Sequence, residues 1–201
     1  MPFQFRGKGL FRKIAPRQNI DEIKALYENV CQLRPKRVLE IGTARGGSLY
    51  LWAQASMDDA TIVSVDLPGG KYGGGYPESK TPFYQSFARS QQKLHLQRAD
   101  SHSPQTLQIV NQIFNGEQLD FLFIDGDHTY EGVKTDFLQY SQLVRPGGII
   151  GLHDILHRPD DSDIHVDRFW NELKIEHQTQ ELIGGPDSGR TIGIGLVHVP
   201  Q

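Results

Sequence analysis

Short apolar runs alternate with amphipathic segments along most of the chain. Each run is bounded by turn-forming or polar residues, which predicts short, largely buried strands. Five such runs stand out: Arg37–Ile41, Thr61–Val65, Leu94–Arg98, Phe121–Ile124 and Ile149–Leu152.

The segments between these runs carry apolar residues at helical spacing. In the first segment, Ile23, Leu26, Tyr27 and Val30 form one stripe, and Asn19 with Glu22 has the spacing of a capping box. The same reasoning predicts helices at Ser48–Ala55, Pro104–Phe114, Val133–Val144 and Val166–Leu173. Strands that alternate with helices indicate βαβ units, and therefore an α/β fold built as a doubly wound, mostly parallel sheet.

The end of the chain breaks this alternation. Two strands, Thr179–Ile183 and Thr191–Val199, are separated only by the turn GGPDSGR, so they are expected to pair antiparallel. A second irregularity is the Gly-rich stretch 67–84, which is predicted to be a functional loop without regular structure.

Composition narrows the class of protein. The chain has 201 residues with 37% apolar and 22% charged residues, as expected for one globular domain. The net charge of −3 gives no electrostatic case for nucleic acid. Cys31 is the single cysteine, which excludes an internal disulfide and favours a cytoplasmic location, and no apolar run is long enough for a membrane span.

The predicted domain organisation has two parts. Residues 1–18 form an arm that carries five basic and three Phe side chains and no acid, and residues 19–201 form a single domain. The arm is expected to be a surface-docked terminus, a lid over the active site, or a contact to an anionic partner.

The segment VLEIGTARGGS predicts a strand, a Gly-rich turn and the start of a helix. The turn has Gly42, Thr43, Gly46 and Gly47, which is neither a dinucleotide fingerprint nor a phosphate-binding P-loop. The next two strands end in acids, Asp66 and then Asp100 with Ser101. Because parallel sheets bind ligands at the carboxyl ends of their strands, these groups are expected to line one site.

Together these features resemble a class I S-adenosylmethionine-dependent methyltransferase over residues 35–199. The resemblance implies seven strands in the order 3-2-1-4-5-7-6, with the last strand antiparallel. It also implies that Glu40, Gly42, Thr43, Gly46 and Gly47 meet the methionine part of S-adenosylmethionine, that Asp66 holds the ribose, and that Asp100 and Ser101 contact the adenine. The alternative is an α/β domain without a cofactor site, in which the glycines only form turns and the acids only cap loops.

A second cluster follows the fourth and fifth strands. FIDGDHTYEG has Asp125, Asp127 and His128, and GLHDI has His153 and Asp154. Neighbouring strand ends should bring these groups together, and carboxylate oxygens suit a hard divalent cation. Asp125 and Asp154 could supply two ligands, with His153, Asp127 and water filling the rest. The pattern resembles metal-dependent O-methyltransferases that act on catechols, sugars and antibiotic scaffolds, in which Asp125 and Asp154 match the metal-binding acids. The relatives imply Mg²⁺ or another divalent metal, and His153, which stands where they usually carry an acid, favours a softer ion such as Mn, Fe, Ni or Zn. The alternative is that Asp125 and Asp154 only cap loops by bonding backbone N–H groups.

The resemblance extends to the chemistry. Sugar O-methyltransferases have a histidine base three residues after the metal-binding acid, and His128 follows Asp125 at that spacing. The prediction is methyl transfer to a hydroxyl of a small molecule, with His128 and Asp125 as catalytic residues.

Other classes are not excluded by the sequence. An NAD-type α/β enzyme, a non-catalytic S-adenosylmethionine-binding protein and a non-haem iron site at His153 and Asp154 remain alternatives. A zinc protease is disfavoured because HDILH lacks the H-E-x-x-H pattern. A homo-oligomer stays possible.

Overall fold

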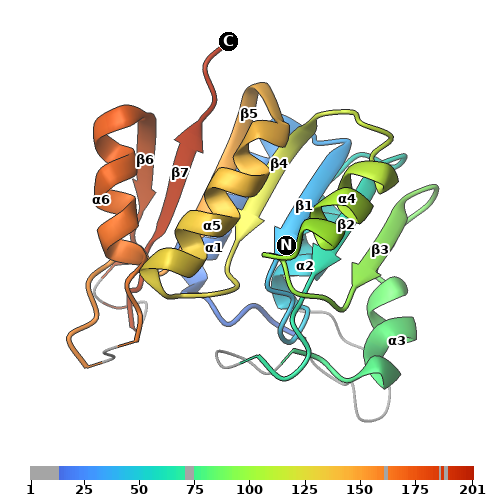
Figure 1. The fold of residues 1–201 in the computed structure, drawn as a ribbon, viewed down its shortest axis with the longest axis horizontal. Helices are drawn as coiled ribbons and strands as arrows, with labels where there is room; N and C mark the ends of the chain where they lie inside the picture. The colour runs from blue at the N-terminus through green and yellow to red at the C-terminus, as the bar shows by residue number, and fades with distance from the viewer. Residues whose placement is uncertain (1–13, 71–74, 161–162, 186, 188–189) are drawn as a thin grey trace.

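A computed structural model describes residues 14–70, 75–160, 163–185, 187 and 190–201. Seven strands form one sheet in the order β3-β2-β1-β4-β5-β7-β6, as the family resemblance implied (Figure 1). The strands are β1 (Arg37–Ile41), β2 (Thr61–Val65), β3 (Lys93–Gln97), β4 (Leu119–Ile124), β5 (Val144–His153), β6 (Gln178–Leu182) and β7 (Ile194–His198). The helices are α1 (Ile20–Leu33), α2 (Gly47–Ala55), α3 (Thr81–Gln85), α4 (Pro104–Ile113), α5 (Tyr130–Tyr140) and α6 (Val166–Glu176), with 3₁₀ turns η2 (Glu78–Lys80) and η3 (Ser141–Leu143).

Helices cover both faces of the sheet. Side chains of α1, α2 and the segment around α3 pack in one core with one face of the strands, and those of α4, α5 and α6 pack in another. In Figure 1, α4 and α5 lie in front of the sheet, with α1 and α2 behind it. The predicted doubly wound α/β architecture is therefore confirmed.

The parallel part of the sheet explains where a site can form. β1 pairs in parallel with both β2 and β4, so the crossover direction reverses between β1 and β4. That reversal opens a crevice outside the carboxyl ends of these two strands. Both strands are almost fully buried, which accounts for their continuous apolar sequences.

The antiparallel ending is also confirmed. β7 pairs antiparallel with both β5 and β6, and therefore inserts between them. Figure 1 shows β7 between β5 and β6.

Three local predictions were wrong. The stretch 67–84 was predicted to lack regular structure, but η2 and α3 begin within it, and α3 buries Tyr84. The helix predicted to reach Val144 ends at Tyr140, and Val144 starts β5. Asn19 does cap α1 by accepting from the backbone N–H groups of Asp21 and Glu22, but the Glu22 carboxylate accepts from Gly184 N instead of closing a capping box.

Most of the predicted arm, residues 1–13, lies outside the described residues, so the division at residue 18 stays a prediction. Ile14 packs against the core beside α1 and α2. Among the described residues, no helix combines the length and the apolar character that a membrane span requires.

Candidate active site

The Gly-rich turn after β1 is fixed by a close approach to the chain after β4. Gly42 has a φ of +95°, and a Cβ there would lie 2.0 Å from the backbone oxygen of Asp125. Gly47, at the start of α2, would meet the backbone of Ala15 at 2.4 Å. Both positions need glycine because another backbone segment occupies the space that a side chain would fill.

Glu40 supports this turn from behind. Its carboxylate is fully buried and accepts hydrogen bonds from Trp52 Nε1 at 2.9 Å and from Ser64 Oγ at 2.6 Å. Burial raises the pKa of Glu40 to about 7, although the hydrogen bonds oppose that rise. Glu40 was predicted to meet the cofactor, but it is not among the residues that line the two cavities described below, and neither is Gly46.

The first cavity lies outside the ends of β1, β2 and β4 and has a volume of about 410 Å³. Its wall brings together Gly42, Asp66, Asp100, Ser101 and Asp125, all of them predicted site residues. Asp66 accepts a hydrogen bond from Ala44 N at 3.1 Å, and burial raises its pKa to about 6. The wall also includes Asp127, and it contains neither Lys nor Arg among the described residues.

The second cavity adjoins the first. It has a volume of about 290 Å³ and shares Gly42, Ala44 and Asp125 with the first cavity. Thr43 and Gly47 line it, as do His128, His153 and Asp154 from the ends of β4 and β5. The two cavities therefore meet at Asp125.

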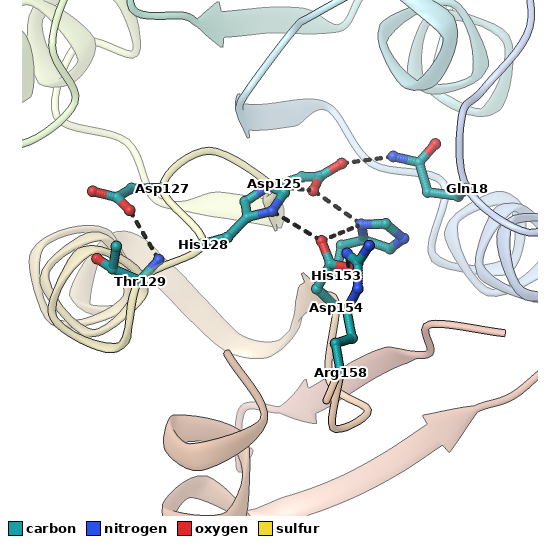
Figure 2. Close-up of polar contacts among 8 residues, drawn as sticks. All are labelled: Gln18, Asp125, Asp127, His128, Thr129, His153, Asp154 and Arg158. Atoms are coloured by element: carbon teal, nitrogen blue, oxygen red, sulfur yellow. Dashed lines mark hydrogen bonds and ion pairs between the residues drawn. The ribbon is translucent and has the colours of Figure 1, made fainter. Parts of the chain in front are cut away.

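Four of the predicted catalytic and metal-binding residues form one network, shown in Figure 2. His153 Nδ1 lies 3.0 Å from Asp125 Oδ1 and 3.2 Å from Asp154 Oδ2. His128 Nδ1 lies 3.1 Å from Asp154 Oδ2, and its Nε2 lies 3.4 Å from Asp125 Oδ1. Two imidazoles thus bridge the buried carboxylate of Asp154 and the partly buried carboxylate of Asp125.

This arrangement shifts the pKa of each titratable side chain in the network. Burial alone would lower the pKa of His153, but the adjacent carboxylates outweigh burial and raise it to about 10. The pKa of His128 is raised for the same reason, again against the effect of burial. Burial would raise the pKa of Asp125, yet contacts with His153 and His128 hold it below its usual range. At neutral pH the carboxylates are ionised and His153 carries a proton.

The same residues fit a divalent cation. Asp125, His128 and Asp154 each offer one ligand atom, and these atoms lie within 4.8 Å of one another. Two carboxylates and an imidazole are a donor set that transition metals accept. The predicted set had His153 in place of His128; in the structure, His153 Nδ1 bridges the two carboxylates at hydrogen-bond distances.

Asp127 was suggested as a further metal ligand, but it is not among the residues whose ligand atoms converge. Its Oδ1 accepts from Thr129 N at 2.9 Å at the start of α5, and in Figure 2 it lies apart from the network. Short Asp side chains commonly bond to the backbone two residues later, which explains this local contact.

Sequence reasoning missed two members of the site. Gln18 Nε2 donates to Asp125 Oδ2 at 2.6 Å, and Arg158 Nη1 donates to Asp154 Oδ1 at 2.6 Å (Figure 2). Arg158 stands in a polar run after β5, and Gln18 precedes α1, so neither is part of a motif. Asp154 has a φ of +62°, a strained backbone of the kind that clusters at functional sites.

Comparisons with known proteins agree with this fold and site. The sequence model of one family, described as "Methyltransferase domain", matches residues 39–155. That range runs from β1 to just past β5 and includes the network around Asp125. The chain belongs to this methyltransferase family.

Individual relatives are distant. The chain is 30% identical over 145 residues to the uncharacterized protein y4gI of Sinorhizobium fredii, which covers 70% of this chain and 15% of that protein. It is 28% identical to tapetum-specific methyltransferase 1 of Arabidopsis thaliana, over 68% of this chain and 54% of the relative. The chain thus spans about half or less of these curated relatives.

A solved structure shares the whole fold. The O-methyltransferase of Bacillus cereus in complex with SAH (S-adenosylhomocysteine) superimposes with a TM-score of 0.67 at 21% identity, covering 92% of this chain and 84% of that one. The fold is accordingly the Rossmann-like methyltransferase fold.

Proposed function

We propose that this protein transfers the methyl group of S-adenosylmethionine to a hydroxyl oxygen of a small molecule, with His128 as the base. The observation that carries the proposal is the meeting of two cavities at Asp125, with His128 on the wall of the second cavity only. A methyl donor in the first cavity and an acceptor in the second would face each other there. The SAH-bound structural neighbour supports this choice of cofactor.

The first cavity has the chemistry that S-adenosylmethionine requires. Asp66 ends β2 and would accept hydrogen bonds from the ribose hydroxyls, while Asp100 and Ser101 follow β3 and would meet the adenine. Four Asp side chains line the wall: Asp66, Asp100, Asp125 and Asp127. Their negative field favours a ligand with a positive sulfonium centre.

The transfer is an in-line displacement. The acceptor oxygen attacks the methyl carbon, the bond between that carbon and sulfur breaks, and S-adenosylhomocysteine leaves. The base must be the neutral form of His128, with Nδ1–H directed to Asp154 at 3.1 Å, so that the hydroxyl proton can pass to Nε2; because the two carboxylates raise the pKa of His128, this form gains population as the pH rises. Asp125 contacts the imidazole and stabilises the charge that it gains, and the two cavity walls hold the reactants in line.

A metal-assisted mode is the second candidate, because the ligand atoms of Asp125, His128 and Asp154 lie within 4.8 Å of one another. A divalent ion held by them would bind the acceptor oxygen and lower its pKa. In that mode His128 would be a ligand of the ion and would not take the proton itself, so the hydroxyl proton would pass to water.

Calorimetry and a turnover assay test the proposal. We expect S-adenosylhomocysteine to bind with 1:1 stoichiometry, and a panel of hydroxylated small molecules to include one that gains a methyl group by mass spectrometry. His128→Ala should lower kcat about 100-fold or more while leaving the affinity for S-adenosylhomocysteine within about twofold. His95→Ala, on β3 and outside both cavities, is the matched control.

The outcomes separate the alternatives. Turnover that survives EDTA supports the base mode, and turnover that EDTA abolishes and Mg²⁺ or Mn²⁺ restores supports the metal-assisted mode. Wild-type turnover by His128→Ala contradicts both. Failure to bind S-adenosylhomocysteine, with binding of NAD instead, would overturn the whole assignment.

A further inference from the structure

The two adjoining cavities differ in charge. The first has four Asp side chains and neither Lys nor Arg among the described lining residues. The second is lined by three arginines, Arg17, Arg45 and Arg158, and by two carboxylates, Asp125 and Asp154. Before any imidazole is counted, the second cavity therefore has a positive excess.

The three arginines come from three separate segments. Arg17 precedes α1, Arg45 lies in the Gly-rich turn, and Arg158 follows β5. Arg158 is engaged with Asp154 at 2.6 Å, and its side chain is 16% exposed. Arg17 and Arg45 are exposed and form no ion pair within the described part of the chain. Two guanidinium groups thus border the cavity without a carboxylate partner there.

The remaining wall indicates the kind of ligand that these groups would meet. It has small or aliphatic residues such as Ala15, Ile164 and Ile192. The hydroxyls of Thr43 and Ser48, which also line it, are hydrogen-bonded to Ser64 and Glu40. No Phe, Tyr or Trp lines it within the described residues, so no such ring is there for a flat aromatic acceptor to stack on. Guanidinium groups match the planar, bidentate geometry of carboxylate and phosphate oxygens.

We propose that the second cavity binds an anionic acceptor, a hydroxylated small molecule with a carboxylate or phosphate group that Arg17 and Arg45 hold. This deepens the proposed function and rests on it for the identity of the cavity as the acceptor site. The negative group would lie at the arginines and the hydroxyl near Asp125 and His128, where the two cavities meet. The negative first cavity would then favour the positively charged methyl donor, and the positive second cavity would favour the anionic acceptor.

One competing use of the arginines must be separated from this one. The methionine part of S-adenosylmethionine has a carboxylate, and the turn that contains Arg45 is the one expected to meet it. That single carboxylate can engage one guanidinium fork, which leaves the other arginine for the acceptor. Affinity for S-adenosylhomocysteine and affinity for an added anion are therefore measured separately.

The test uses inorganic pyrophosphate and malonate as probes, titrated by calorimetry into the full chain saturated with S-adenosylhomocysteine. We expect saturable binding of at least one of them, and no binding of malonamide, the neutral analogue of malonate. Arg17→Gln and Arg45→Gln should each weaken the probe about tenfold, and the double variant further. Lys93→Gln, which removes one positive charge at the start of β3, is the matched control and should leave probe affinity unchanged.

The response to the two probes identifies the group: a preference for pyrophosphate indicates a phosphate, and a preference for malonate a carboxylate. Absence of binding by both probes overturns the proposal, as does a loss in both variants of affinity for S-adenosylhomocysteine alone. Probe binding to a protein that methylates nothing would refute the proposed function and leave the anion site standing. Equal methylation of charged and neutral versions of one acceptor would refute the anion site and leave the proposed function standing.

Discussion

Gln18 donates a hydrogen bond of 2.6 Å from Nε2 to Oδ2 of Asp125, across 107 positions of the sequence. This contact ties the segment before α1 to the loop after β4, at the point where the two cavities meet. Asp125 Oδ1 is meanwhile engaged by the imidazoles of His153 and His128. Gln18 therefore fixes the one oxygen of this carboxylate that the histidines do not hold.

We expect Gln18→Ala to lower kcat about tenfold, because a hydrogen bond to a charged group contributes about 1.5–3 kcal/mol and Asp125 would turn away from its productive orientation. Affinity for S-adenosylhomocysteine should change less, so kcat and KM report the positioning role separately. Gln180→Ala, on the exposed β6, removes the same group far from the site and should leave kcat unchanged. An unchanged kcat for Gln18→Ala, or a loss that merely follows a lower melting temperature, would contradict this role.

A second prediction concerns stability and pH. His102 Nε2 lies 3.4 Å from Oδ1 of Asp136, a carboxylate with 0% exposure beneath the first cavity. Contact with Asp136 raises the pKa of His102 from 6.5 to about 9, against the smaller effect of burial. Because the folded-state pKa of His102 exceeds the unfolded value, this contribution to stability is present near pH 6.5 and is lost as pH rises through about 9. On the acid side it persists only while Asp136, whose own pKa burial raises, stays ionised.

His102→Gln should lower the free energy of unfolding near pH 6 by about 1–3 kcal/mol, since it leaves Asp136 buried without its partner and the partial exposure of His102 weakens the pair. Near pH 9.5 the variant and the parent should differ much less. His95→Gln is the matched control because burial lowers the pKa of His95, which gives a pH dependence of opposite sign. Urea unfolding at a series of pH values checks this, and a constant difference between the two proteins at all pH values would refute it.

The sequence predicts the central strands well because strands that are buried on both faces are continuous apolar runs, which are easy to recognise. Val38, Leu39 and Ile41 of β1 are buried, as all of β4 is, so apolar runs identify them without reference to partners. The order of the strands came from the family resemblance, since pairing between distant segments has no local signal. That order makes β4 and β5 neighbours, and the side chains that follow them were therefore expected to cluster: Asp125, His128, His153 and Asp154.

The misses have equally physical reasons. α3 has only five residues and follows a Gly-rich stretch, so its helical pattern is too short to detect. Val144 continues the apolar spacing of α5 by coincidence, because the next strand begins there. Gln18 and Arg158 belong to the site through tertiary contacts with Asp125 and Asp154. The sequence around a single polar residue outside a motif has no pattern that predicts such a contact.

The last prediction compares two glycines with positive φ. Gly42 has a φ of +95° and faces the backbone oxygen of Asp125, whereas Gly116 has a φ of +70° with no atom within 4 Å of where its Cβ would lie. Alanine at position 116 incurs only the cost of a left-handed conformation, about 1 kcal/mol. Alanine at position 42 adds a collision with rigid backbone, so the turn after β1 or the loop after β4 must move. We expect Gly42→Ala to lower the free energy of unfolding by about 3 kcal/mol or more.

The two variants also separate fold from function. Because displacement of the backbone at Asp125 disturbs the wall that both cavities share, Gly42→Ala should lose affinity for S-adenosylhomocysteine even at temperatures where it stays folded. Gly116→Ala, in the connection between α4 and β4, should keep that affinity. Thermal unfolding and calorimetry on both variants measure the two effects. Equal destabilisation by the two substitutions would mean that the φ angle, and not the contact with Asp125, is what requires glycine at position 42.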